Sequence, residues 1–315
     1  MENSPRKSRT LSSSLRRTRE EYAGKDRVGT RRKVSSKDKN NPRVLGLIAG
    51  MGQLPVSIAA EAKKMGYYVV GIALQPPADE SLRPVTDEFH KVRIGSFGGL
   101  LALLKKLAVT EAVMAGKIPK KLLYENKKNL IPDIKAVKLI FSLKDRADDS
   151  IMNAVVNELE KNNITVHKTT TFTKNLLAPE GLLTRHKPSR EDMKDIEFGW
   201  EIAKKIGQLD IGQTVVVKKR AVMAVEAIEG TDEAIQRGGA LAQKGAVVIK
   251  VSKPQQDMRF DVPAVGIDTL SSMKKAGAKV LALEAAKCII VDKEYFLKEA
   301  DRAGIAVIGI NPEHR

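Results

Sequence analysis

The sequence predicts an α/β protein, with a Rossmann-like N-terminal domain and a distinct C-terminal α/β (α+β) domain. Three observations support this prediction. Apolar, strand-like runs alternate with helical segments from residue 43 onward, a glycine turn closes the first of these runs, and a polar, Pro-containing stretch at residues 169–188 divides the chain. A length of 315 residues fits two domains, and 42% hydrophobic with 30% charged residues is a soluble, globular composition.

The N-terminal half begins with a buried-type strand at residues 43–49 and the turn Gly50-Met-Gly52. A helix at 55–65 follows, with Pro55 in its first turn. Strands are then expected at 67–74, 90–94, 111–115 and 164–168, and helices at 98–107, 134–143 and 148–162. This order predicts a parallel sheet in a nucleotide-binding domain that spans residues 43–170.

A linker is predicted at residues 171–188 and a catalytic domain at 189–315. The second domain opens with a helix at 189–206 that has acidic residues in its first turn and lysines in its last, as the helix dipole favours. Strands are expected at 213–217, 221–227, 246–251, 280–284, 288–291 and 305–310, and helices at 232–243, 269–276 and 294–303.

The net charge of +17 is concentrated near the start of the chain, where residues 1–43 hold 14 Lys and Arg against 5 Asp and Glu. Residues 1–42 are rich in Ser and Arg, and we expect a disordered basic tail without the apolar core of a secretory signal. Such a tail is compatible with nucleic acid, anionic lipid, a targeting role or an over-extended reading frame.

The single cysteine, Cys288, lies in an apolar run and is interpreted as a small buried hydrophobe in a protein of the reducing cytoplasm. The four histidines have no ligand spacing, which argues against zinc. No apolar run approaches the roughly 20 residues that span a bilayer. No Walker lysine loop or G-x-S-x-G elbow occurs.

The glycine turn is the first candidate site, since backbone N–H groups before a helix suit a phosphate. Its candidate substrate-binding residues are Gly50, Gly52, Gln53 and Pro55. Pro55 stands where a dinucleotide fingerprint has its third glycine, and residues 73–77 lack the acidic residue that grips an NAD ribose. We therefore expect a nucleotide or diphosphate other than NAD, with a purely structural turn as the alternative.

The second candidate is the acidic strand end at residues 226–235. Thr231 is placed to cap the next helix, and Asp232 complements its dipole, so both have a structural interpretation beside a substrate-binding one. Glu226 and Glu229 lack such an explanation. Carboxylates beside a phosphate require a cation between them, so a functional role here implies Mg²⁺ or Mn²⁺.

The third candidate is the segment at residues 250–263, in which Asp257, Arg259 and Asp261 alternate with apolar residues. In an extended chain, this alternation sends both carboxylates and the guanidinium to one face. With Lys253, the segment offers both signs of charge, as hydrolysis at phosphorus requires. A salt-bridged loop without catalytic function is the alternative.

Six motifs, in this order along the chain, resemble a family of UDP-2,3-diacylglucosamine pyrophosphatases of lipid A biosynthesis, the family distinct from the calcineurin-like enzymes. The motifs include the glycine turn and the two segments just described. They are residues 48–55, 177–181, 195–199, 209–213, 224–235 and 253–263. The resemblance implies two domains that hold the lipid product between them. It also implies Mg²⁺-dependent hydrolysis of UDP-2,3-diacylglucosamine to UMP and 2,3-diacylglucosamine 1-phosphate in the cytoplasm, with peripheral contact at the inner membrane surface.

The family has an essential aspartate in its C-terminal domain, and motif position assigns that role to Asp257, with Asp261 second. Our hypothesis is that both bind Mg²⁺ with help from Glu226 and Glu229, while Lys253 and Arg259 neutralise developing charge. Two alternatives stay open: a Rossmann-type nucleotide-sugar enzyme or oxidoreductase, and a basic nucleic-acid-binding protein, which we expect least. A homo-oligomer is compatible with the sequence, and the resemblance says nothing about residues 1–42.

Overall fold

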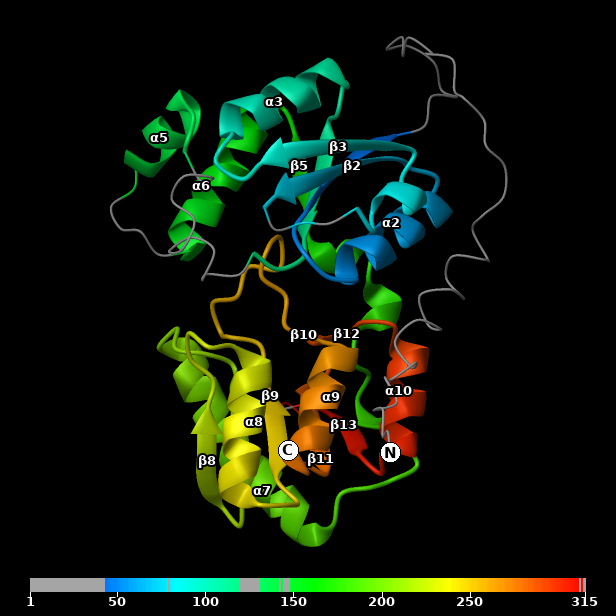
Figure 1. The fold of residues 1–315 in the computed structure, drawn as a ribbon, viewed down its shortest axis with the longest axis vertical. Helices are drawn as coiled ribbons and strands as arrows, with labels where there is room; N and C mark the ends of the chain where they lie inside the picture. Colours follow the sequence, from blue (N-terminus) through cyan, green and yellow to red (C-terminus); the bar gives the residue numbers. More distant parts are fainter. Residues whose placement is uncertain are drawn as a thin grey trace, which may run out of the picture. The chain divides into compact units, whose positions relative to one another are not determined.

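The computed structural model describes residues 43–76, 78, 80–118, 131–141, 143, 148–311 and 313; the predicted basic tail lies outside these described residues. Two separate main sheets, each with helices on both faces, confirm the predicted α/β class (Figure 1). In the part of the chain described, no helix is both long enough and apolar enough to cross a membrane.

The first sheet is entirely parallel and has the strand order β3-β2-β1-β4-β5, which matches the first five strands of the classic Rossmann order. Helix α2 packs on one face, and α3, α5 and α6 pack on the other. The elements are β1 (Val44–Ala49), α2 (Leu54–Lys64), β2 (Tyr68–Gln75), η1 (Arg83–Val85), β3 (Glu88–Arg93), α3 (Phe97–Lys106), β4 (Glu111–Ala115), α5 (Ile134–Phe141), α6 (Asp148–Lys161) and β5 (Thr165–His167).

The second sheet is mixed, with the order β6-β13-β11-β9-β7-β8. Strands β9, β11 and β13 run parallel, while β7 is antiparallel to both of its neighbours. Helix α7 covers one face, and α8, α9 and α10 cover the other. The elements are η2 (Thr169–Thr171), η3 (Lys174–Leu176), β6 (Gly181–Leu182), α7 (Arg190–Gln208), β7 (Thr214–Lys218), β8 (Ala221–Val225), α8 (Thr231–Ala242), β9 (Val247–Lys250), β10 (Ala264–Val265), α9 (Ile267–Ala276), β11 (Val280–Glu284), β12 (Ile289–Ile290), α10 (Lys293–Arg302) and β13 (Ala306–Ile310).

Two details differ from the expected elements. Strand β6 comes from the stretch predicted as linker and pairs antiparallel with β13, so part of that stretch belongs to the second sheet. The strand expected at residues 288–291 is β12, which pairs with β10 in a small ribbon outside the main sheet. Neither β6 nor β10 shows in the sequence, because two-residue strands are too short to have a hydrophobic period.

The start of α7 follows the expected chemistry. Ser189 is its N-cap and forms a capping box with Asp192, which satisfies N–H groups that a helix leaves free. One turn later, the buried Asp195 accepts hydrogen bonds from the backbone N–H groups of Lys219 (2.9 Å) and Arg220 (2.6 Å). These two residues have positive φ in the tight turn between β7 and β8, so Asp195 holds that hairpin against the helix.

Cys288 is fully buried in the core, as predicted, and burial raises the pKa of its thiol to about 12. The thiol is therefore protonated at neutral pH and is not a nucleophile.

The close packing of α8 against α9 gives a stability prediction. An added Cβ at Gly239 would lie 2.3 Å from Cβ of Ala276, so the crossing has no room for a methyl group. Helix propensity alone would make Gly239→Ala stabilising by about 1 kcal/mol. We expect instead a loss of about 1–3 kcal/mol in the free energy of unfolding, measured with urea, because overpacking dominates.

The reverse change at the exposed Ala240, on the same helix, serves as the control. Ala240→Gly should cost about 1 kcal/mol through propensity alone. A Gly239→Ala protein as stable as the parent would show that the helices separate without cost.

Candidate functional site

Polar side chains gather at the carboxyl edge of the second sheet. Strand β9 ends at Lys250, β11 ends at Glu284, and Glu226 follows the end of β8, which runs in the same direction. All three side chains are buried, with at most 8% of their surface exposed. The crevice at the carboxyl ends of parallel strands is the usual ligand site of open α/β sheets, so this edge is the first place to look for chemistry.

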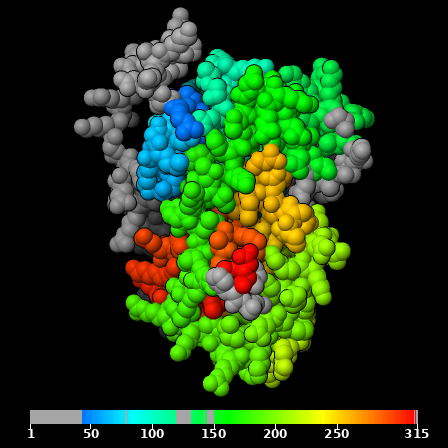
Figure 2. Space-filling model, turned by 180° about the vertical axis from the view of Figure 1, so that it is seen from behind, coloured from blue at the N-terminus to red at the C-terminus, as the bar shows by residue number. Residues whose placement is uncertain are grey.

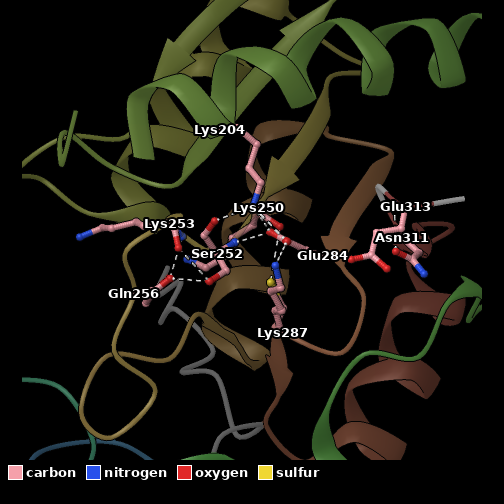
Figure 3. Close-up of polar contacts among 10 residues, drawn as sticks. Lys204, Lys250, Ser252, Lys253, Gln256, Glu284, Lys287, Asn311 and Glu313 are labelled. Carbon is pink, nitrogen blue, oxygen red and sulfur yellow. Dashed lines mark hydrogen bonds and ion pairs between the residues drawn. The ribbon is translucent and has the colours of Figure 1, made fainter. Parts of the chain in front are cut away.

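Glu284 is the centre of the network at this edge (Figure 3). Its carboxylate is fully buried. It accepts hydrogen bonds from Nζ of Lys204 at 2.7 Å, from Nζ of Lys287 at 2.8 Å and from the backbone N–H of Ser252 at 2.8 Å. Burial opposes ionisation of the carboxyl group, but these donors outweigh burial and hold the pKa of Glu284 below its ordinary value. The group is therefore a buried, fully bonded carboxylate at neutral pH.

This network fixes the start of the loop that follows β9. Lys204 also donates to the backbone carbonyl of Ser252 at 2.9 Å, so both backbone groups of that residue are held. The side-chain carbonyl of Gln256 then accepts the Ser252 hydroxyl at 3.0 Å and the backbone N–H of Lys253 at 2.8 Å. The backbone is thus pinned before it reaches the predicted catalytic residues.

Lys253 points away from the Glu284 network (Figure 3). Its Nζ lies 2.7 Å from Oδ1 of Asp210, two residues after α7, and 3.7 Å from Oδ2 of Asp261. The structure therefore brings Lys253 and Asp261, two of the predicted catalytic residues, together.

The prediction that residues 257–261 are extended is wrong. Residues 258–260 form a turn in which the backbone N–H groups of Phe260 and Asp261 both donate to the carbonyl of Asp257. Asp257 and Asp261 are therefore one turn apart, as in a helix, and do not alternate along a strand. The carbonyl of Asp257 finds its partners within the loop itself, whereas a strand would need a neighbour that the loop lacks.

Arg259 forms a close pair with Asp257. Its Nε donates to both carboxylate oxygens at 3.0 Å, and its Nη2 donates to Oδ2 at 2.6 Å. The hydrogen bonds from this guanidinium are the main cause that holds the pKa of Asp257 below its usual range. Both side chains are about one quarter exposed, so the pair remains reachable by solvent.

The same loop contacts the first sheet and its helices. Arg259 donates to Oδ1 of Asn153 at 3.2 Å and lies 3.5 Å from Glu160, both on α6. The carbonyl of Met258 accepts the N–H of Thr169, just after β5, and Phe260 packs against the core under α3 and α6. Figure 2 shows the loop in orange beside the green chain of this region. Residues 252–261 thus connect the carboxyl edges of the two sheets.

Glu226 and Thr231 lie in a second buried network, with Lys250. Lys250 Nζ donates to the Thr231 hydroxyl at 2.6 Å, and that hydroxyl donates to Oε1 of Glu226 at 2.9 Å. Thr231 does not cap α8 as expected, because Gly230 is the N-cap and the hydroxyl is used by Glu226. Burial opposes ionisation of Glu226, but the Lys250 charge and these bonds keep its pKa below the ordinary value.

The remaining predicted residues have separate surroundings. Glu229 pairs with Arg237 at 2.5 Å. The hydrogen bond from Arg237 is the main cause that lowers the pKa of the Glu229 carboxyl group. Oδ1 of Asp232 is buried without a hydrogen-bond partner among the described residues. In the described part of the chain, no three His, Cys, Asp or Glu side chains form a group that could hold a metal ion by themselves. The four predicted metal ligands therefore do not form a ready-made cage.

The glycine turn lies at the carboxyl edge of the first sheet, where the strand order changes direction between β1 and β4. Met51 and Lys117 bridge the two strand ends, and a Cβ on Gly50 would lie 2.6 Å from the Lys117 carbonyl, so only glycine fits. Gly52 and Gln53 are exposed, while Pro55 is buried in the first turn of α2. No side chain caps α2, so the nucleotide assignment of these residues stays a prediction with suitable geometry.

Sequence reasoning missed several residues that shape the site, chiefly Lys204, Lys250, Ser252 and Glu284. A signal was available: β9 and β11 are apolar strands that each end in a charged residue, Val-Val-Ile-Lys250 and Val-Leu-Ala-Leu-Glu284. Charged residues at the carboxyl ends of neighbouring parallel strands lie at one edge of the sheet. Their pairing with Lys204 of α7 is visible only in the fold.

Comparison with known families gives two adjoining matches. The family described as "LpxI N-terminal domain" matches residues 44–176, and "LpxI C-terminal domain" matches residues 179–308. Among curated proteins, the chain is 32% identical over 286 residues to "UDP-2,3-diacylglucosamine pyrophosphatase LpxI" of Caulobacter vibrioides, covering 87% of this chain and 99% of that protein.

Likeness to solved structures is much weaker. UDP-glucose-4-epimerase of Stenotrophomonas maltophila has 15% identity and a TM-score of 0.23, covering 36% of this chain and 33% of its own. Phosphoribosylglycinamide synthetase of Anaerococcus prevotii has 15% identity and a TM-score of 0.24, covering 62% and 34%. The chain spans about one third of each solved chain, and these scores carry no argument about function.

The Glu284 network gives a second prediction. Glu284→Gln should lower the free energy of unfolding at pH 7 by about 3 kcal/mol, because Lys204 then loses its buried counter-charge. The folded pKa of Glu284 is lowered, so its contribution exists above the unfolded value of about 4.3 and is lost as the pH falls through the folded pKa. The difference between parent and variant, measured with urea, should therefore shrink on acidification below about pH 4.

Glu191→Gln is the matched control, since Glu191 forms an exposed pair with Lys194 on the same helix as Lys204. It should lower the urea midpoint far less than Glu284→Gln does, because an exposed pair and one charge at a helix start contribute little. Equal stability of parent and Glu284→Gln at pH 7 would contradict the anchoring role.

Proposed function

We infer that this chain, which belongs to the LpxI family, hydrolyses UDP-2,3-diacylglucosamine to UMP and 2,3-diacylglucosamine 1-phosphate in lipid A biosynthesis. The observation that supports this function most directly is the match to the UDP-2,3-diacylglucosamine pyrophosphatase of Caulobacter vibrioides, which covers 99% of that protein's length. The two family matches follow one another along the chain with almost no gap, so the chain contains both domains of the family.

The loop at residues 252–261 is the part of the structure that best suits this reaction. A water molecule attacks one phosphorus, the bond to the bridging oxygen breaks, and negative charge builds up on the phosphate oxygens. Arg259 and Lys253 supply two cations on one loop, within reach of the carboxylates of Asp257 and Asp261. We propose that both cations bind the diphosphate and stabilise that charge.

The state of Asp257 decides between two roles. An efficient general base has a pKa near the working pH, whereas the pKa of Asp257 is lowered below the ordinary aspartate value by Arg259. At neutral pH the group is ionised and a weak proton acceptor. We therefore propose that Asp257 binds a cation or orients the attacking water, and that Asp261 assists from one turn away.

Mg²⁺ fits this pair of aspartates better than the four carboxylates first suggested. Protein-bound Mg²⁺ is commonly held by one or two carboxylates together with substrate phosphates and water, so no three-carboxylate cage is needed. Asp257 and Asp261 are partly exposed and lie one turn apart on the same loop, whereas Glu226 is buried in the network with Thr231 and Lys250. Glu229 pairs with Arg237 on α8, away from this loop. When bound, Mg²⁺ would supply positive charge to the diphosphate oxygens. Arg259 would have to leave Asp257 for the phosphate.

We propose that the nucleotide lies at the glycine turn, where Gly52 and Gln53 are exposed beside an uncapped helix start. Thr231 and Asp232 remain proposed substrate contacts, and the orphaned Oδ1 of Asp232 is suited to a hydroxyl or water donor. We also propose that the enzyme is cytoplasmic and contacts the inner membrane surface peripherally, because its substrate is amphiphilic.

Asp257→Asn tests the site assignment. It removes one charge with almost no change in size, and we expect kcat for UMP release to fall by roughly a hundredfold or more. The urea midpoint of the variant shows whether the fold is kept. Asp261→Asn, tested in parallel, ranks the two aspartates.

Asp268→Asn is the control, because Asp268 is an exposed residue in the first turn of α9 and is not part of the proposed site. It should retain parental activity. Undiminished turnover in both Asp257→Asn and Asp261→Asn would remove this loop from the mechanism.

The metal requirement is tested separately. After dialysis against EDTA, UMP release from UDP-2,3-diacylglucosamine dispersed in detergent should fall to background, and added Mg²⁺ should restore it. Full turnover in excess EDTA would contradict the metal proposal and leave the pyrophosphatase function intact.

A further inference from the structure

Helix α5 exposes large apolar side chains to solvent. Ile134 is 76% exposed and Phe141 is 80% exposed, the latter the highest value for a large apolar side chain among the residues that the structure describes. Positions 134, 138 and 141 follow the i, i+4, i+7 spacing of one helical stripe, so Ile134, Lys138 and Phe141 share a face. We call this stripe, with the adjacent Lys135, the outer face of α5. Ile131, just before the helix, is 64% exposed as well.

The opposite face of α5 already packs against the protein. Ala136 is buried in the core formed with α3 and α6, and Leu139 packs against that core. The outer face is therefore not needed to attach the helix to its domain. Exposed apolar side chains that cluster, rather than occur singly, indicate a binding surface.

Charge indicates what kind of surface would cover this face. Both charged residues of α5, Lys135 and Lys138, are exposed lysines, and the helix contains no acidic residue. The surrounding sequence has the same sign, since residues 117–146 contain nine Lys and Arg against three Asp and Glu. A second copy of this chain would bring like charges together, whereas an anionic bilayer complements them.

We propose that the outer face of α5 is the membrane-docking surface of this protein, and that it binds anionic phospholipid headgroups while Ile134 and Phe141 enter the headgroup boundary. The eight residues of α5 form a helix of about 12 Å, which is far too short to span a bilayer and suited to lie in its interface. The proposal rests on the proposed function in one respect: an enzyme with an amphiphilic substrate must approach the surface that contains it.

Vesicle sedimentation of the full-length protein tests the proposal. The probes are phosphatidylcholine vesicles, with and without one third phosphatidylglycerol. We expect binding only to the anionic vesicles. Ile134→Gln with Phe141→Gln should reduce partitioning by about tenfold or more, and Lys135→Gln with Lys138→Gln by about thirtyfold.

Matched controls come from other exposed positions. Leu241→Gln with Tyr295→Gln changes two exposed apolar side chains on α8 and α10, and Lys274→Gln with Lys275→Gln changes two exposed lysines on α9. Both should sediment like the parent. Equal losses in the controls, or parental binding by the α5 variants, would overturn the proposal.

A spectroscopic variant separates α5 from other basic parts of the chain. The sequence contains one tryptophan, the buried Trp200, so Phe141→Trp adds an exposed reporter on the outer face. Its emission should shift to shorter wavelength when anionic vesicles are added. Sedimentation without that shift would show that α5 does not enter the bilayer, and the proposal would be wrong.

Activity measurements keep this test independent of the proposed function. In detergent-dispersed UDP-2,3-diacylglucosamine, the α5 variants should keep the parental kcat and KM while losing vesicle binding. A raised KM in detergent would instead assign the outer face to the acyl chains of the substrate, and would overturn docking. Lack of turnover by the parent would count against the proposed function alone.

Discussion

The buried carboxylate of Glu284 is the constraint on which the site depends. A carboxylate without exposed surface is stable only when cations and N–H donors replace its lost water, and here Lys204, Lys287 and Ser252 do so. The arrangement ties three elements together at one point: α7, the end of β11 and the second residue after β9. Because loss of a partner would leave the buried charge less well compensated, these contacts stabilise the geometry of this edge at neutral pH.

The conformation of the loop at residues 252–261, and its contacts with the first domain, follow from this anchored start. Gln256 closes its first turn, and the Asp257 carbonyl closes the second. Arg259 and Phe260 then contact the helices of the first sheet. The charged residues of the loop are therefore held from both sides while staying partly exposed, as a site that must release its products requires. Asp257 and Arg259 balance each other's charge in the structure. In the mechanism that we propose, the negative diphosphate of the substrate would compete with Asp257 for the guanidinium.

We propose different roles for two surfaces of the first domain. Its carboxyl edge presents the glycine turn to the proposed nucleotide, while the outer face of α5 presents apolar and basic side chains to solvent. A substrate with a polar nucleotide and two acyl chains offers matching chemistry to both, since its head requires N–H groups and cations and its tails remain with the lipid surface. The family match assigns the reaction, and the side chains suggest how the protein approaches its substrate.

The sequence by itself determined the fold class, nearly every strand and helix, the buried state of Cys288 and the family. These follow from hydrophobic period, glycine turns and motif strings, which are local properties of the chain. Only the tertiary structure decided that residues 257–261 turn rather than extend, that the Thr231 hydroxyl serves Glu226 instead of capping α8, and that Glu284 anchors the loop. The physical reason is common to all three, since each depends on which hydrogen-bond partner is nearest in the folded chain. Thr231 meets Lys250, and Glu284 meets Lys204, only after helices and strands that are distant in sequence pack together.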